Sequence, residues 1–232
     1  MDRVAGAAVE AASMTVHAPP LREIYPAKRR AKRKAPLGGS LKRACDILCA
    51  SVLLTLLLLP LLAIALLVRL DSKGPALFRQ RRGGYGGRPF LILKFRTMTV
   101  EDDGKHVVQA ALQDPRVTRL GAFLRKTSLD ELPQLFNVLV GEMSLVGPRP
   151  HAVAHDRLFA DVDPTYRRRQ RARPGITGLA QIKGSRGPTH CPDDIRRRTA
   201  LDLRYVEHWH IFLDIWILIR TALLVLFDRK AF

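Results

Sequence analysis

The most pronounced hydrophobic pattern in the chain is an uncharged run, ILCASVLLTLLLLPLLAIALLV, over residues 47–68. A straight helix of this length would rise about 33 Å, enough to cross the roughly 30 Å hydrocarbon layer of a bilayer. Pro60 interrupts the run, because proline lacks the N–H that would bond to the carbonyl of Leu56. Lysine and arginine residues flank both ends, and such flanks favour the cytoplasmic face. The pattern predicts a re-entrant membrane helix over residues 41–72 that bends at Pro60. An ordinary span and a buried core helix are the alternatives.

Shorter patterns follow the apolar run. Residues 75–98, PALFRQRRGGYGGRPFLILKFRTM, predict two short strands joined by a glycine-rich turn, and alternation places Lys94 and Arg96 on one face of the second strand. The glycines predict a hairpin turn, with a phosphate-cradling loop as the alternative, while their spacing excludes a dinucleotide fingerprint. Residues 211–227 are too short and too charged for a span and predict an interfacial or core-packing helix. The expected fold class is α/β, mostly helical with few short strands, and membrane-associated through the re-entrant, proline-broken helix and interfacial helices.

The charge balance narrows the choice of partner. Thirty-nine Lys and Arg against 21 Asp and Glu give a net charge of +18, which predicts a polyanionic partner. No helix-turn-helix, zinc-finger or aromatic RNA-binding pattern is present, so we expect no nucleic acid. Residues 1–40 predict a disordered basic tail whose charge, next to the apolar run, suits membrane lipids with anionic headgroups. Residues 73–232 then form a cytoplasmic catalytic domain. The three cysteines form no CxxC pair, which favours a reducing compartment.

The stretch KTSLDELPQLFNVLVGEM, residues 126–143, places two acids in a basic neighbourhood at the start of a helical pattern. Ser128 and Glu131 fit a capping box, so helix capping alone is one explanation of the pair. The other explanation is chemical. A helix start favours negative charge, and adjacent side chains on a helix diverge by about 100°. Asp130 and Glu131 would then have different tasks, one facing a reacting phosphorus and the other holding a metal.

Arginines in restricted loops favour the chemical explanation. Arg149 lies between two prolines in SLVGPRPH, and a stiffly held guanidinium suits a two-pronged phosphate contact. Arg125 shortly precedes the acid pair, and Arg173 lies with Lys183 and Arg186 in the glycine-rich stretch RARPGITGLAQIKGSRG. Each of these residues alone is compatible with a solvated surface charge. Together they predict a basic pocket around the acid pair.

Three stretches, in this order, resemble the bacterial sugar transferases: FRQRRGGYGGRPFLILKFRTM, DPRVTRLGAFLRKTSLDELPQLFNVLVGEMSLVGPRP and RPGITGLAQIKGSRG. These are the monotopic polyprenyl-phosphate phosphoglycosyl transferases that begin the assembly of surface polysaccharides. The closing DLRYVEHWHIFLDIWILIRTALLVLF is similar to the family too, although His210 stands where a small polar residue is usual. The resemblance covers residues 40–227 and implies a re-entrant helix broken at a proline, here preceded by Leu59 instead of the usual serine. The four-helix region of longer members is absent from the sequence, so a short form is expected.

The resemblance implies a reaction and a set of roles. Asp130 corresponds to the family's nucleophile, which attacks the sugar-bearing phosphorus of a UDP-sugar and releases UMP. Glu131 corresponds to the residue that holds Mg²⁺, and Arg125 and Arg149 correspond to phosphate-binding arginines. Undecaprenyl phosphate then takes the sugar phosphate from the aspartyl intermediate, at the cytoplasmic face of the bacterial inner membrane, as the first step of exopolysaccharide assembly. The expected substrate-binding set is Lys94, Arg96, Arg125, Arg149 and Arg173.

The sequence leaves several points open. The donor sugar has no motif of its own, and similarity to exopolysaccharide-initiating members favours a hexose, galactose or glucose. A homodimer is compatible with this class. Two rival functions remain: a structural membrane anchor, which leaves the acid pair unexplained, and a glycosyl transferase that moves only the sugar and releases UDP instead of UMP.

Overall fold

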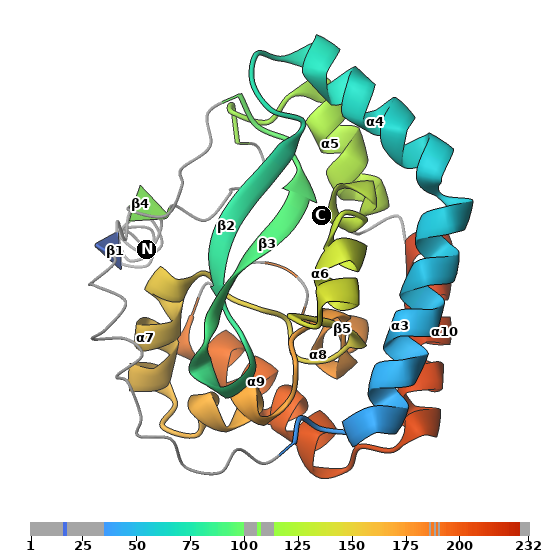
Figure 1. Cartoon of the computed structure of the whole chain (residues 1–232). Helices are drawn as coiled ribbons and strands as arrows, with labels where there is room; N and C mark the ends of the chain where they lie inside the picture. Colours follow the sequence, from blue (N-terminus) through green and yellow to red (C-terminus); the bar gives the residue numbers. More distant parts are fainter. Residues whose placement is uncertain are drawn as a thin grey trace.

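A computed structural model of the chain describes residues 16–17, 35–99, 106–107, 114–185, 187, 189 and 191–227. Helices dominate these residues, and the strands are short and pair two by two (Figure 1). The expected fold, mostly helical with few short strands, is confirmed. The α-helices are α3 (Gly39–Leu56), α4 (Leu58–Asp71), α5 (Arg119–Thr127), α6 (Gln134–Val140), α7 (Val153–Val162), α8 (Leu179–Ile182), α9 (Pro192–Glu207) and α10 (Ile211–Phe227). The strands are β1 (Val16–His17), β2 (Leu77–Gly83), β3 (Pro89–Phe95), β4 (His106–Val107), β5 (Ser144–Val146) and β6 (Gly175–Thr177), and the 3-10 turns are η2 (Tyr85–Gly87), η3 (Leu129–Glu131) and η4 (Tyr166–Arg171).

The apolar run forms two helices instead of one. α3 ends at Leu56 and α4 begins at Leu58, and the two helices are bent by 65° at the break. The break lies just before Pro60, because a proline removes the hydrogen bond to the preceding turn and its ring presses on that turn. Among the described helices, none alone is long and apolar enough to cross a membrane, whereas α3 and α4 together meet that test by length and composition. The predicted bend is confirmed, and it lies at Leu57.

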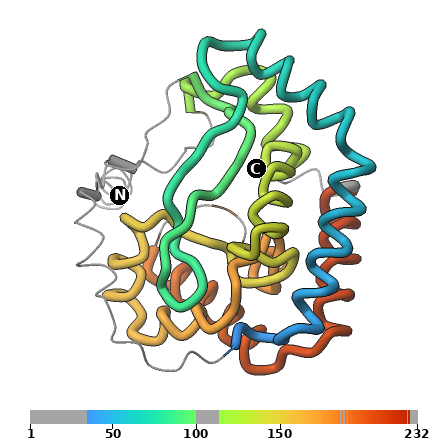
Figure 2. Tube along the Cα trace, in the orientation of Figure 1, coloured from blue at the N-terminus to red at the C-terminus, as the bar shows by residue number. Residues whose placement is uncertain are grey.

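Charged side chains near the start of α3 attach this helix to the rest of the molecule. Lys42 forms a buried ion pair with Asp214 of α10. Asp46 accepts hydrogen bonds from the hydroxyl of Ser144 and the backbone N–H of Leu145, both at 3.0 Å. α3 and α10, which are far apart in sequence, therefore lie side by side (Figure 2).

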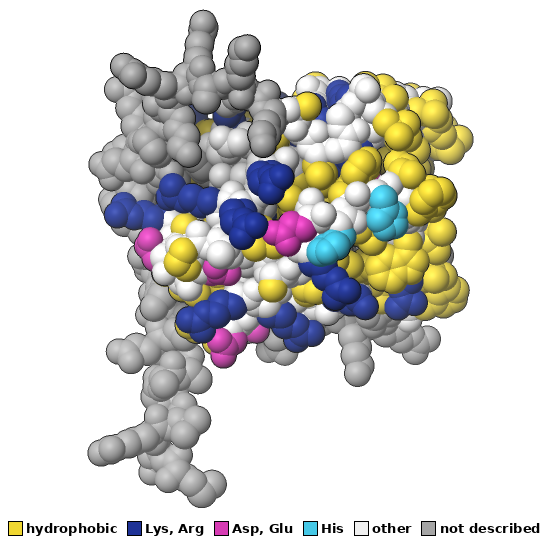
Figure 3. Space-filling model, turned by 90° about the horizontal axis from the view of Figure 1, so that it is seen from below, with side chains coloured by type: hydrophobic (Ala, Val, Ile, Leu, Met, Phe, Trp, Pro, Cys, Tyr) yellow, Lys and Arg dark blue, Asp and Glu magenta, His cyan; other side chains and the backbone are white. Residues whose placement is uncertain are grey.

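Helices α3, α4 and α10 expose many large apolar side chains. These side chains gather on one side of the molecule, beside a surface that carries Lys and Arg (Figure 3). An exposed apolar surface of this kind marks a contact with a membrane or another protein. The most exposed members are Leu48, Leu56, Leu59, Leu70, Phe212 and Phe227.

The glycine-rich segment is a hairpin turn, as predicted. β2 and β3 pair antiparallel from Leu77↔Phe95 to Gly83↔Pro89. Gly86 and Gly87 have positive φ angles of 63° and 75°, a conformation that glycine adopts without steric cost. The glycines therefore form the turn of the hairpin, and Lys94 lies near the end of its second strand, β3.

The main core lies between β3, α6 and the parallel pair β5–β6. Phe90 and Ile92 of β3 pack with Val138 of α6, Val146 of β5 and Ile217 of α10. This packing places the start of α6 beside β3 and the loop after β5. The tail expected at residues 1–40 falls outside the described residues except for 16–17 and 35–40; β1 there pairs with β4.

Candidate active site

The acid pair lies in a tight turn between two helices. α5 ends at Thr127, and Ser128 takes the left-handed conformation with φ 59°. In the described part of the chain it is the one non-glycine residue with positive φ, and backbone strain of this kind gathers at functional sites. The chain then enters η3, where Asp130 and Glu131 are both buried. The strained backbone at Ser128 thus directs the two carboxylates into the molecule.

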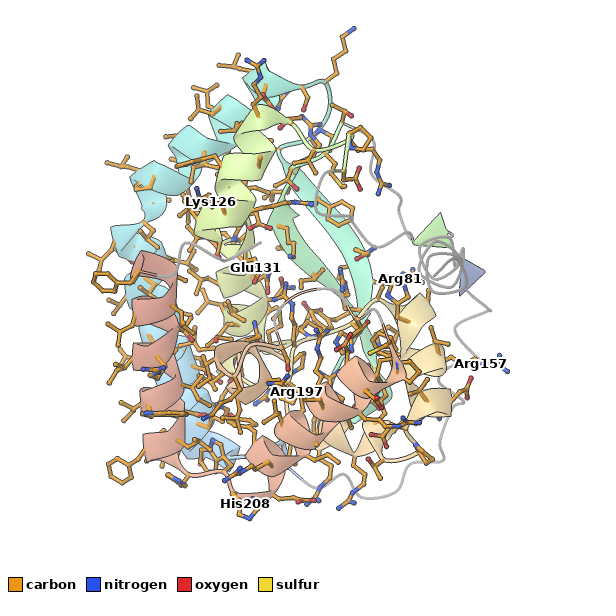
Figure 4. The ribbon with its side chains drawn as sticks, turned by 180° about the vertical axis from the view of Figure 1, so that it is seen from behind. Arg81, Lys126, Glu131, Arg157, Arg197 and His208 are labelled. Atoms are coloured by element: carbon orange, nitrogen blue, oxygen red, sulfur yellow. The ribbon has the colours of Figure 1, made fainter. Side chains whose placement is uncertain are left out.

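The expected capping box at this turn does not form. No side-chain capping bond is made at Ser128, and Pro133 takes the cap position of α6. Glu131 turns its carboxylate toward β3 and the loop after β5, in the middle of the molecule (Figure 4). Helix capping therefore does not explain the pair.

Glu131 is fixed by two cations. Arg149 binds both of its carboxylate oxygens, with Nη2 2.6 Å from Oε1 and Nη1 3.1 Å from Oε2. The Nζ of Lys94 donates to Oε1 at 2.8 Å. Burial raises the pKa of Glu131, but the charges of Arg149 and Lys94 outweigh burial and hold this pKa well below its usual range. Glu131 is therefore a carboxylate at neutral pH, held in one orientation.

Asp130 is held more loosely and has the opposite electrostatics. The nearest ion-pair contact of Asp130 is Lys94, whose Nζ lies 3.7 Å from Oδ2. Burial raises the pKa of Asp130; the charge of Lys94 opposes the rise, and the charge of Glu131 adds to it. A buried carboxylate with a raised pKa and few fixed partners is suited to react or to bind an incoming group.

An asparagine on α6 sets the distance between the acid pair and β3. The Oδ1 of Asn137 accepts the backbone N–H of Leu93 at 3.0 Å, and its Nδ2 donates to the carbonyl of Leu91 at 2.7 Å. This pair of bonds joins α6 to the edge of β3 as another strand would. Lys94 follows directly in the chain, so the same contact holds its ammonium beside Glu131.

The loop that carries Arg149 is fixed by backbone bonds to β6. The N–H of Gly147 donates to Thr177 at 2.8 Å, and the N–H of Gly175 donates to Pro148 at 3.0 Å. The guanidinium of Arg169 donates to the carbonyl of Arg149 itself. The predicted stiff loop is present, and it aims Arg149 at Glu131.

The structure brings some of the predicted arginines to the acid pair and not others. Arg125 donates from Nε to the hydroxyl of Thr97 at 2.8 Å, and its charge acts on Asp130. Arg173 donates to the carbonyl of Gly141 at 3.0 Å, at the far end of α6. That end lies about 10 Å from the helix start, given a rise of 1.5 Å per residue. Arg173 is thus a helix C-terminal contact. Lys183 lies over the Trp216 ring of α10 and not at the acid pair, with its Nζ 5.8 Å from the ring centroid, and Arg186 falls outside the described residues.

Arg96 also lies apart from the acid pair. Its guanidinium is buried and donates to the carbonyls of Val68, Ser72 and Lys73, at 3.1, 2.6 and 2.8 Å. These carbonyls belong to the end of α4, where a cation is favourable. Arg96 therefore joins the broken helix pair to β3 and does not face the acid pair.

Buried cations behind Arg149 were not predicted. Arg82 donates to the carbonyl of Pro150 at 3.2 Å, and Nη1 of Arg198 lies 3.4 Å from Nε2 of His151. Burial, and then the charge of Arg149, lower the pKa of Arg82 to about 10 and that of Arg198 to about 10. Such mutual repulsion makes the region receptive to an anion. No sequence signal marked Arg198, which ends a run of three arginines on α9 that reads as a solvated surface.

The donor set suits a magnesium ion bound together with a substrate. Mg²⁺ in phosphate-transfer sites is held by one or two carboxylates, with substrate phosphates and water as the remaining ligands. Asp130 and Glu131 offer two adjacent carboxylates beside cations that would attract a diphosphate. Within the described residues, no group of three or more His, Cys, Asp or Glu side chains could hold an ion without such a substrate.

Comparison with known proteins finds one matching family and relatives named as sugar-phosphate transferases or exopolysaccharide production proteins. The model of the family described as bacterial sugar transferase matches residues 37–228. A Caulobacter vibrioides protein named UDP-glucose:undecaprenyl-phosphate glucose-1-phosphate transferase is 54% identical over 182 residues, which are 78% of this chain and 68% of that protein. An Escherichia coli protein of the same name is 47% identical over 200 residues, 85% of this chain but 43% of that protein. The exopolysaccharide production protein PSS of Rhizobium leguminosarum bv. phaseoli is 46% identical over 196 residues, 83% of this chain and 98% of that protein. The chain thus spans less than half of the E. coli relative and nearly all of the Rhizobium one.

Proposed function

Since the chain belongs to the bacterial sugar transferase family, we propose that it transfers a sugar 1-phosphate from a UDP-sugar to undecaprenyl phosphate. The glucose transferases among its relatives favour UDP-glucose as the donor, with UDP-galactose as the second hexose to test. The observation that carries the proposal is the contrast within the acid pair. Glu131 is immobilised by Arg149 and Lys94, whereas Asp130 beside it is buried and loosely held.

Asp130 is the nucleophile in this proposal. Its carboxylate attacks the sugar-bearing phosphorus, the bond from that phosphorus to the bridging oxygen breaks, and UMP leaves with the electron pair. The product is an aspartyl phosphate that still carries the sugar. A phosphate oxygen of undecaprenyl phosphate then attacks the same phosphorus, which restores the Asp130 carboxylate and forms the lipid diphosphate sugar. Splitting the reaction in two suits substrates that arrive from water and from the membrane.

Cations supply most of the stabilisation that such a transfer needs. Negative charge accumulates on the phosphoryl oxygens in the transition state, and preorganised positive groups stabilise it. Lys94 contacts both acids, and Arg149 and Arg125 are placed to bind the diphosphate. Glu131 would hold Mg²⁺, which neutralises diphosphate charge when bound.

The apolar surface of α3, α4 and α10 gives the enzyme its place at a membrane. A polyprenol stays in the bilayer, since each buried CH₂ contributes about 0.8 kcal/mol. The active site must therefore lie at the headgroup plane, and basic flanks on both sides of the bent pair favour the cytoplasmic face of the inner membrane. In this arrangement the enzyme would start exopolysaccharide assembly on its lipid carrier.

The test is the identity of the released nucleotide. Membrane fractions with the full chain receive UDP-glucose, UDP-galactose or an N-acetylated UDP-sugar, together with Mg²⁺ and undecaprenyl phosphate. We expect UMP and a lipid diphosphate sugar with UDP-glucose, and no UMP with Asp130→Asn. Release of UDP would indicate transfer of the sugar alone and would overturn the proposal. Turnover of only N-acetylated donors would overturn the choice of hexose.

A further inference from the structure

A basic cavity lies away from the acid pair, where α8, α9 and α10 meet. Its volume is about 340 Å³, in the range of roughly 300–1,000 Å³ that small-molecule sites occupy. In the described part of the chain, none of its lining residues forms a hydrogen bond or ion pair with Asp130 or Glu131. The lining residues are Leu179, Lys183, Leu201, Arg204, His208, His210, Leu213 and Trp216.

The lining divides into an apolar half and a basic half. Leu179, Leu201, Leu213 and Trp216 supply apolar surface, and Trp216 is 41% exposed on the same face of α10 as the large apolar patch. Lys183 lies with its Nζ 5.8 Å from the centroid of the Trp216 ring. The cavity therefore joins an exposed apolar surface to a cationic rim.

The basic half carries positive charge that no acidic side chain of the described residues pairs with. Among the described residues, neither Lys183 nor Arg204 forms an ion pair, and both are exposed. The Nδ1 of His210 lies 3.2 Å from the backbone N–H of Leu213 and the ring is exposed, so Nε2 is the ring nitrogen that can face a ligand. His208 stands at the end of α9, at the rim of the molecule (Figure 4). Uncompensated cations beside apolar surface are complementary to a negatively charged, amphiphilic ligand.

We propose that this cavity binds the phosphate group of an anionic membrane phospholipid. Lys183, Arg204 and His210 would hold the phosphate, and the leucines with Trp216 would contact the first methylenes of the acyl chains. The site is separate from the catalytic centre and would fix the depth and rotation of the enzyme at the headgroup plane. It rests on the membrane association proposed above, but not on the transfer reaction.

Quenching of Trp216 fluorescence tests this site directly. The full chain in detergent is titrated with phosphatidylglycerol or phosphatidylcholine that carries bromine at the same acyl positions. The two lipids differ in net charge and carry the same quencher. Stronger quenching by one of them therefore reports a preference of the cavity for its headgroup. Two cations near a membrane surface together raise the affinity for an anionic lipid roughly 30-fold. We expect phosphatidylglycerol to bind more tightly than phosphatidylcholine by a factor of this order. The Trp216→Phe variant should lose the preferential signal, which assigns it to this cavity rather than to Trp209.

Charge-matched variants separate the cavity from general attraction. Lys183→Ala with Arg204→Ala should abolish the preference. The control, Arg157→Ala with Arg167→Ala, removes the same amount of charge from exposed residues and should keep the preference for phosphatidylglycerol. Arg157 lies on α7, on the other side of the molecule from α10 (Figure 4). Equal quenching by both lipids, or a preference that survives loss of Lys183 and Arg204, would overturn the proposal.

Competitors identify the source of the phosphate. Unbrominated phosphatidylglycerol should reverse the quenching, whereas millimolar inorganic phosphate should not. Stronger displacement by polyprenyl phosphate would make the cavity an acceptor site and overturn the assignment, as would displacement by inorganic phosphate. UMP release in detergent should persist in the Lys183 and Arg204 variant. Loss of UMP release from every protein, with the lipid preference intact, would refute the transfer reaction and leave this inference standing.

Discussion

Arg149 binds both carboxylate oxygens of Glu131, at 2.6 and 3.1 Å, whereas the ion-pair contact of the adjacent Asp130 within the described residues is with Lys94, at 3.7 Å. Two neighbouring carboxylates thereby acquire opposite electrostatics. The pKa of Glu131 is held down by its two cations against the effect of burial, and the pKa of Asp130 is raised by burial. Adjacent acids whose pKa values are pushed apart have different roles.

Asp130→Asn should abolish transfer and increase stability. Asparagine keeps the shape of the side chain and removes the cost of burying a charge, so we expect a higher melting temperature at neutral pH. Because the pKa of Asp130 is raised in the folded state, its ionisation lowers stability progressively as pH rises above the unfolded value of 3.8. The melting-temperature difference between variant and wild type should therefore grow from acid to neutral pH, as measured by thermal unfolding in detergent.

The wild-type enzyme provides the matching activity measurements. UMP release should fall as pH is lowered through the raised pKa of Asp130, since the protonated acid is no nucleophile. With UDP-glucose and Mg²⁺ but no undecaprenyl phosphate, mass spectrometry should detect an adduct on Asp130. An adduct on another residue, or an active Asp130→Asn enzyme, contradicts this role.

Glu131→Gln should reduce both stability and activity. Removing one partner of a fully buried ion pair costs about 3–5 kcal/mol; Arg149 keeps some solvent access, so we expect about 2 kcal/mol. Because the pKa of Glu131 is depressed on folding, its stabilisation is present above the unfolded value of 4.5 and is lost as pH falls through the folded pKa. The stability difference measured by denaturant should thus shrink at acid pH, opposite to Asp130→Asn.

Magnesium dependence separates the structural and catalytic parts of this effect. UMP release by the wild type should stop with EDTA and return with Mg²⁺, and Glu131→Gln should need a higher Mg²⁺ concentration. The same Mg²⁺ requirement in both proteins would show that Glu131 acts only through its ion pair.

The sequence predicted the acid pair, the bent apolar helix and the hairpin because each depends on local chemistry. A proline inside a helical run removes a backbone hydrogen bond and favours a bend there, and a glycine turn between alternating strands forms a hairpin. Arg96 could not be placed in this way, since its partners are carbonyls at the end of α4, which only tertiary packing brings to β3. Arg82 and Arg198 were missed for the same reason: they reach Pro150 and His151 from distant parts of the chain, in stretches where arginine is common.

Arg96→Met should destabilise the protein without impairing chemistry. Three hydrogen bonds from a buried guanidinium to the end of α4 would be lost, and a bond to a charged group contributes about 1.5–3 kcal/mol. We expect a loss of roughly 3 kcal/mol in the free energy of unfolding. UMP release per folded molecule should stay near the wild-type rate. Arg149→Met is the comparison, and it should lose turnover; an equal loss in Arg96→Met would return Arg96 to the substrate-binding set.

The bend at Leu57 predicts where the two ends of the apolar pair lie. If α3 and α4 enter the bilayer and return, Ser40 at the start of α3 and Ser72 just after α4 are on the cytoplasmic side. Single cysteines at these positions, in a chain without Cys45, Cys49 and Cys191, should resist an impermeant thiol reagent in intact spheroplasts and react after permeabilisation. Labelling of one position alone in intact cells would establish an ordinary span.

Pro60→Leu provides the matched variant for this topology. Leucine restores the N–H that can bond to the carbonyl of Leu56, so α3 and α4 can join into one straight helix of spanning length. We expect one of the two engineered cysteines to become accessible from outside in this variant, together with a loss of UMP release, since the catalytic domain could no longer keep its contacts with both helices. Arg96 joins the end of α4 to β3, and Lys42 joins the start of α3 to α10, so straightening the pair must break one of these attachments. A Pro60→Leu enzyme with unchanged labelling and full activity would show that packing against the domain, and not the proline, holds the 65° bend.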